Sequence, residues 1–272
     1  MNKTKIEWCD ATWNPVTGCL HNCEYCYARR IAGRFGTLFK GQQPEDEGLS
    51  FLPDEPERFW ELDEPVRNEG GKIEPFPANF YPTLHRYRMD EPQNTKKHQS
   101  VFVCSMAGLF GAWVPDEWIE AVFAACDRAP QHTYLFLTKN AERYEALRCK
   151  HKLPARENFW YGSTITDAST SCYWSSGEFN TFLSVEPLLK PPGERGIDKE
   201  IRWVIVGAMT GPGSQNHRPP REWVENIMEA AALTKAAVFM KDSLKNVWGH
   251  DLIREFPTEM SRESEVEDHD RA

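Results

Sequence analysis

Short apolar runs alternate with amphipathic stretches along the chain from residue 100 onward. Runs typical of buried strands lie at 100–106, 133–139, 159–165, 181–187, 202–208 and 237–241. Stretches with helical spacing lie between several of them, at 115–129, 140–150 and 220–235. This alternation is typical of parallel strands covered by helices, so we expect an α/β fold.

The first hundred residues follow a different pattern. Tyr27, Ile31, Ala32 and Phe35 fall at helical spacing behind a cysteine-rich segment and predict an amphipathic helix. Residues 36–92 are rich in Gly, Pro and acids and lack a regular period. They predict an insertion with short elements, such as a turn at 57–62, or alternatively a disordered linker. We therefore expect one domain over 1–257 with an insertion at 36–92, followed by a disordered acidic tail over 258–272.

The charge of the chain is unevenly distributed. Acids outnumber bases by 41 to 32, giving a formal charge of -9, which at first argues against a nucleic-acid ligand. Residues 44–65 hold nine acids and one Arg, and the tail 261–272 holds five acids and two Arg, so the remainder is near +2. No apolar run approaches the ~20 residues that span a bilayer, and the start has no signal-peptide core. We expect a cytoplasmic protein with no membrane partner, for which a nucleic-acid substrate is not excluded.

Three of the eight cysteines form the sharpest motif. Cys19, Cys23 and Cys26 have the spacing C-x3-C-x2-C directly before the first predicted helix. Such a loop can place three thiolates around an iron-sulfur cluster, and a following helix start favours their negative charge. A structural zinc site, completed by Cys9 or His21, is the alternative, although no second C-x2-C or C-x2-H pair is present.

The motif, with the aromatic Tyr25 before its last cysteine, resembles the signature of radical S-adenosylmethionine (SAM) enzymes. The wider text resembles a narrower group of phage- and bacterium-borne radical-SAM-like proteins of unassigned function, which are described with a three-Cys-motif partner protein. They are also loosely similar to spore photoproduct lyase. The matching segments, between about Lys5 and Pro257, are KIEWCDATWNPVTGC, CYARR, CSMAGLFG, PDEWIEAVF, LTKNAERY, SVEPLL, WVIVGAMTGPG and VFMKDSL.

This resemblance implies a partial (β/α)6-type barrel with the cysteine loop after its first strand. It implies that Cys19, Cys23 and Cys26 bind three irons of a 4Fe-4S cluster, whose fourth iron SAM chelates. An electron from a donor such as flavodoxin or ferredoxin would cleave SAM to methionine and a 5'-deoxyadenosyl radical, which abstracts a substrate hydrogen. A nucleic-acid base or nucleotide is the first expected substrate, from the phage association, and a peptide or small metabolite is the second. The non-enzyme alternative is a zinc- or cluster-stabilised nucleic-acid-binding protein.

Residues at the carboxyl ends of predicted strands are candidates for ligand contacts, because ligands of α/β folds bind there. In the barrel, Ser105 and Met106 are expected near the methionyl amine of SAM, and Thr164 and Thr166 near its ribose. The full set of cofactor candidates is Tyr25, Ser105, Met106, Thr164, Thr166, Ser184, Glu186, Gly207 and Thr210.

Three further residues are candidates for catalysis. Cys104 is the choice for a hydrogen-atom donor. Lys139 and Lys241 are candidates for binding a carboxylate or phosphate of the substrate, with structural ion pairs as the alternative.

Two positions depart from the family pattern. Gly108 stands where many relatives carry Asp, and Met209 stands where relatives often carry Glu. Both departures put the chemistry after SAM cleavage in doubt and leave the cysteine assignment untouched.

Basic residues mixed with aromatic ones are typical of nucleic-acid contacts, and equally of solvated surfaces. Such clusters lie at 29–34, 85–88 and 96–98.

Overall fold

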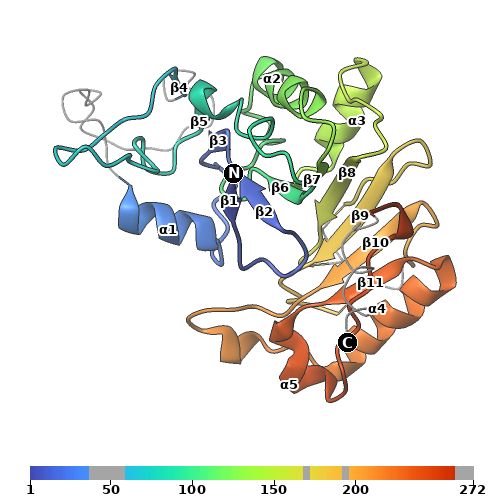
Figure 1. Cartoon of the computed structure of the whole chain (residues 1–272). Helices are drawn as coiled ribbons and strands as arrows, with labels where there is room; N and C mark the ends of the chain where they lie inside the picture. Colours follow the sequence, from blue (N-terminus) through green and yellow to red (C-terminus); the bar gives the residue numbers. More distant parts are fainter. Residues whose placement is uncertain (37–58, 168–171, 192–195, 261–272) are drawn as a thin grey trace, which may run out of the picture. The chain divides into compact units, whose positions relative to one another are not determined.

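The computed structural model describes residues 1–36, 59–167, 172–191 and 196–260 (Figure 1). The chain divides into two compact units, Met1–Pro154 and Ala155–Ala272. The fold is mixed α/β with mostly parallel strands, which confirms the predicted class. The barrel and the single domain stay predictions. No helix in the described part of the chain has the length and apolarity needed to cross a membrane.

Among the described residues, the larger sheet of the first unit contains four strands in the order β1-β2-β6-β7. Strand β1 is antiparallel to β2, and the other neighbours are parallel. Helices α2 and α3 follow the last two strands along the chain. The bounds are β1 Asn2–Lys3, β2 Ala11–Trp13, β6 Ser100–Val103, α2 Asp116–Asp127, β7 Thr133–Thr138 and α3 Glu142–Cys149. Strands β2 and β6 are buried along their whole length, including the polar residues Thr12 and Ser100.

A smaller sheet in the same unit has the order β3-β5-β4. Its strands are β3 Val16–Thr17, β4 Trp60–Leu62 and β5 Thr83–His85, the last followed by a 3-10 turn at Arg86–Arg88. The turn predicted at 57–62 is wrong, because Trp60–Leu62 pairs with β5 as a strand. Residues 59–92 therefore carry ordered elements, while 37–58 lie outside the described residues.

Helix α1 spans Tyr27–Phe35, as its spacing predicts, but packs through its smallest residues. Ala28 and Ala32 face inward against Phe76 and Phe80. The larger apolar residues are exposed: Tyr27 by 46%, Ile31 by 39% and Phe35 by 52%. The pattern predicts the helix correctly, but the large apolar face points toward solvent.

The second unit carries four parallel strands in the order β8-β9-β10-β11. Helix α4 packs on β10 and β11 through Val224, Ile227 and Ala231, which join the buried core of this unit. The bounds are β8 Phe159–Thr164, β9 Asn180–Val185, β10 Ile201–Val206, α4 Arg221–Thr234, β11 Ala237–Met240 and α5 Lys245–Trp248, with 3-10 turns at Ser214–His217, Asp242–Leu244 and Thr258–Met260. The predicted tail beyond 260 lies outside the described residues.

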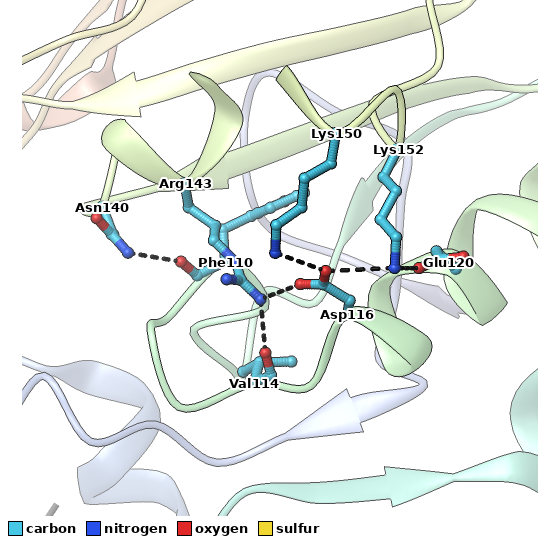
Figure 2. A network of polar contacts seen from close by, with 8 residues as sticks. All are labelled: Phe110, Val114, Asp116, Glu120, Asn140, Arg143, Lys150 and Lys152. Atoms are coloured by element: carbon cyan, nitrogen blue, oxygen red, sulfur yellow. Dashed lines mark hydrogen bonds and ion pairs between the residues drawn. The ribbon is translucent and has the colours of Figure 1, made fainter. Parts of the chain in front are cut away.

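An ion-pair network ties α2 to α3 and holds the loop before α2 (Figure 2). The Arg143 guanidinium donates to Asp116, at 2.7 Å, and to the carbonyl oxygen of Val114, at 2.8 Å. Lys150 and Lys152 approach the same carboxylate at 3.0 and 3.3 Å. The side chain of Asp116 is only 14% exposed, so the network fixes the loop that leads from β6 to α2.

The charge of Asp116 stabilises the folded chain above mildly acidic pH. Desolvation raises the pKa of this carboxyl, but the hydrogen bonds from Lys150 and Lys152 and the charge of Arg143 outweigh it and hold the pKa below 3.8. We expect Asp116→Asn to lower the free energy of unfolding by about 2 kcal/mol at pH 7. Because a depressed pKa contributes stability that is lost as pH falls through it, the difference should shrink below pH 3.8. Urea unfolding of the wild type and the variant at several pH values measures this difference in the free energy of unfolding.

Asp90→Asn is the matched control for this prediction. Asp90 also contacts an arginine, Arg128 at 3.2 Å, but its side chain is 71% exposed. We expect a change of at most about 0.5 kcal/mol. Equal losses in both variants at every pH would contradict the assigned role of Asp116.

Candidate functional site

The three cysteines lie in the segment that joins β3 to α1. Cys26 caps the N-terminus of α1, and its Sγ accepts a hydrogen bond from the Arg29 N–H at 3.3 Å. The Sγ of Cys19 accepts from the His21 N–H at 3.5 Å. All three side chains are partly exposed and none is in a disulfide. Backbone donors therefore already point at two of the three sulfurs.

The Cys19 thiol of this loop resists ionisation. Burial raises the pKa of Cys19 to about 11, and the neighbouring Cys26 and Cys23 add to the rise, against the hydrogen bond from His21. The Cys19 thiol is therefore protonated at neutral pH. A bound cation offsets this cost and displaces the proton, so metal binding at such a loop is coupled to proton release.

The cysteine loop rests on the segment that follows β6. Gly18 donates its N–H to Met106 O at 2.9 Å, and Gly108 donates its N–H to Gly18 O at 3.2 Å. Gly18 has a φ of 89°, and a Cβ there would stand 2.1 Å from the Tyr81 carbonyl oxygen. A Cβ on Gly108 would stand 2.9 Å from the Sγ of Cys19. Both glycines are needed for this close approach.

Asn14 holds the supporting segment and was not predicted as a site residue. Its Oδ1 accepts from the Met106 N–H at 2.9 Å and from the Ser105 hydroxyl at 3.2 Å. The Ser105 carbonyl oxygen accepts from the Tyr27 hydroxyl at 2.7 Å. The structure thus brings Ser105 and Met106 to the cysteine loop. The Asn-Pro pair predicts a local turn, but it gives no signal for partners 91 and 92 residues away.

Three buried side-chain nitrogens around the loop have no hydrogen-bond partner among the described residues. They are His21 Nε2, Arg29 Nε and Trp113 Nε1. The His21 and Trp113 rings meet edge-on at 4.8 Å, and both border Gly108. Buried donors normally find a partner. Their concentration beside three thiols therefore fits a ligand that carries acceptor atoms or negative charge.

Two more predicted residues meet at the same loop. The Nζ of Lys139, at the end of β7, lies 5.5 Å from the centre of the Tyr25 ring. The charge of Lys139 also contributes, after burial, to a lowered pKa for His21. The Lys139 ammonium group therefore lies close to two residues of the cysteine loop, Tyr25 and His21.

Cys104 directly precedes Ser105 and Met106 in the chain. It is 4% exposed, and its φ of 56° lies in the left-handed region. Burial raises its pKa to about 12, so the sulfur keeps its proton. The protonated sulfur has the S–H group that a hydrogen-atom donor requires. Cys104 also has a structural role, because its carbonyl oxygen accepts a hydrogen bond from the Ala107 N–H in a turn.

The remaining candidates lie in the second unit, and two of them form an ion pair. Lys241, after β11, binds the carboxylate of Glu186, after β9. Gly207 lies beside them, and a Cβ there would approach both side chains to 3.1 Å. The two side chains are 16% and 23% exposed, so the structural pairing anticipated for Lys241 is present.

The hydroxyl-bearing candidates of this unit differ in exposure. Thr164 and Ser184 are buried and lie opposite one another in the register of β8 and β9. Thr166 is partly exposed, and its carbonyl oxygen accepts from the Leu189 N–H. Thr210 is exposed.

The basic run at 85–88 is used inside the first unit. His85 is fully buried and bonds the Thr17 hydroxyl at 2.8 Å; burial, followed by the charge of Arg88, lowers its pKa to about 3. Arg86 pairs with Glu61, and Arg88 donates to the Asn14 carbonyl oxygen. These contacts account for the run without a nucleic acid.

Comparison with known proteins gives a family. The chain belongs to the DUF5131 family. The model of this family, a protein of unknown function, matches residues 3–270. No curated protein and no solved structure matches the chain. DUF5131 membership assigns no activity, so a function has to be argued from the residues themselves.

Gly108 provides a test of the packing at the cysteine loop. We expect Gly108→Ala to lower the free energy of unfolding by about 2 kcal/mol, because the added Cβ overlaps the Sγ of Cys19 and the Trp113 ring. Chemical denaturation measures the loss. Thiol labelling should also show a changed rate at Cys19.

Gly33 is the matched control in the same DUF5131 chain. It lies in α1, and a Cβ there meets nothing within 4 Å. Gly33→Ala should therefore raise stability by about 1 kcal/mol through helix propensity. A stability gain from Gly108→Ala as well would show that the cysteine loop does not sit where the structure has it.

Proposed function

We propose that this protein is a radical-SAM-type enzyme whose Cys19, Cys23 and Cys26 hold a 4Fe-4S cluster. When bound, such a cluster supplies the electron that cleaves SAM reductively to a 5'-deoxyadenosyl radical. The observation that carries the proposal is the presence of three reduced thiols and three buried, unpartnered side-chain nitrogens at one loop. The thiols are free of disulfides, and the nitrogens are the donors Arg29 Nε and Trp113 Nε1 and the ring atom His21 Nε2.

The residues of the loop have separable roles under this proposal. The thiolates of the three cysteines would bind the cluster. Gly18 and Gly108 leave room for the loop to pack against the segment after β6. Asn14 orients Ser105 and Met106, the candidates for the methionyl end of SAM. Lys139 lies over the ring of Tyr25 and so adds a positive charge beside the cysteine loop.

The cysteine spacing favours a cluster over a structural zinc ion, because the sequence has no second C-x2-C or C-x2-H pair to complete four zinc ligands. Cys9, one residue considered for a zinc site, is buried in the core.

Anaerobic reconstitution with iron and sulfide tests the proposal. We expect about four irons per chain, broad visible absorption and formation of 5'-deoxyadenosine from SAM under dithionite. Cys23→Ala should lose the cluster absorption and at least nine-tenths of the SAM cleavage, because it removes one of three ligands.

Cys149→Ala and Cys172→Ala are the controls, since both residues are exposed cysteines outside the loop. Both should retain full iron content and cleavage. Tightly held zinc with no SAM cleavage by the wild-type protein would refute the enzyme, and unaltered cluster in Cys23→Ala would refute the ligand assignment.

A further inference from the structure

The outward face of α1 carries a continuous apolar row. Tyr27, Ile31 and Phe35 follow one another at a spacing of four residues, and all three are exposed. The inward face of the helix is already filled by Ala28 and Ala32. Rows of large apolar side chains on an exposed helix face are typical of protein contact sites.

The same face is positively charged. Arg30 and Arg34 are exposed and fall between the apolar residues, three positions after Tyr27 and Ile31. The guanidinium of Arg34 lies 5.1 Å from the centre of the Phe35 ring. The helix sequence YARRIAGRF contains no acid. A partner for this face therefore has to bring negative charge around an apolar centre.

This face begins at the cysteine loop. Cys26 is the N-cap of α1, and Tyr27 is the first residue of the helix. The Tyr27 hydroxyl also bonds the Ser105 carbonyl oxygen, on the segment that supports the loop. A protein bound to this face therefore contacts the first turns of α1, next to the cysteine loop.

We propose that the face formed by Tyr27, Arg30, Ile31, Arg34 and Phe35, here called the α1 face, docks an acidic electron-donor protein. This inference rests on the proposed function, which needs one electron at the cysteine loop for each SAM cleaved. The donor is oxidised by one electron and the site is reduced by one, with no atom transferred. Acidic side chains of the donor pair with Arg30 and Arg34, while its apolar surface covers Ile31 and its two aromatic neighbours.

The charge count favours a protein over a nucleic acid on this face. Tight binding of a nucleic acid takes several phosphate contacts, whereas the α1 face offers two exposed arginines. Its two aromatic rings, Tyr27 and Phe35, are separated by the aliphatic Ile31, which cannot stack on a base. An aliphatic and aromatic centre with arginines around it matches the composition of protein interfaces.

Calorimetric titration of the reconstituted full-length protein with a flavodoxin, an acidic donor, tests the docking. Two double variants are used: Arg30→Glu with Arg34→Glu, and Ile31→Ser with Phe35→Ser. We expect the wild type to bind, more weakly at higher salt, and each double variant to bind at least tenfold more weakly. Tyr27 is left in place because its hydroxyl supports the loop.

Two exposed residues of the second unit give matched controls, Lys199→Glu and Leu233→Ser. Lys199 is 86% exposed at its side chain, and Leu233 is 88% exposed. Neither change should alter the affinity for flavodoxin. Circular dichroism and thermal unfolding check that every variant folds.

A separate readout distinguishes this inference from the proposed function. SAM cleavage driven by dithionite needs no docking, so it should be unchanged in both double variants, while cleavage driven by flavodoxin should fall at least tenfold. No cleavage by the wild type under dithionite overturns the proposed function, and the titration still decides the docking. Absent or unaltered flavodoxin binding overturns the docking. Two other results would also overturn the docking, both in the case where the wild type does not bind flavodoxin. In the first, the wild type binds a single-stranded oligonucleotide and the double variants do not. In the second, the wild type is a dimer and the double variants are not.

Discussion

The close approach of the cysteine loop to the segment after β6 is the constraint on which the rest of the first unit depends. Two backbone hydrogen bonds join Gly18 to Met106 and to Gly108, and a side chain at either glycine would enter occupied space. The ion-pair network around Asp116 holds the other end of that segment through the Val114 carbonyl oxygen. The segment that supports Cys19 is therefore held at both ends, by Gly18 at one and by residues of α2 and α3 at the other.

The same constraint explains which face of α1 is inside. The helix packs against Phe76 and Phe80, and Cys19 and Cys26 pack against the same apolar cluster. Only small residues allow a helix to approach so closely, so Ala28 and Ala32 face inward. Hydrophobic spacing locates a helix, but it does not say which of two apolar faces is buried when one is made of alanine. That is why the sequence predicts the helix and not its orientation.

Elsewhere, prediction succeeds where a pattern is local and fails where a contact is distant in the chain. The strands and helices from Ser100 to Met240 follow their apolar runs closely, because each run is decided by its own residues. Glu186 and Lys241 were correctly singled out as strand-end residues, but their ion pair joins positions 55 residues apart. The part played by Asn14 depends in the same way on Ser105 and Met106, which no spacing rule connects to it.

Local rules of structure are broken most often around the cysteine loop, and this concentration is itself an argument for function. Among the described residues, five other than glycine have a positive φ. His151 and Lys235 follow the ends of α3 and α4, where a left-handed residue commonly closes a helix. Asn22 lies within the loop, and Asn79 and Cys104 lie in the two segments that support it. Asparagine adopts a positive φ readily, but the left-handed Cys104, the thiol of Cys19 with its raised pKa and the unpartnered nitrogens each cost stability. Costs concentrated at one place are typical of functional sites, which supports the proposal made for this loop.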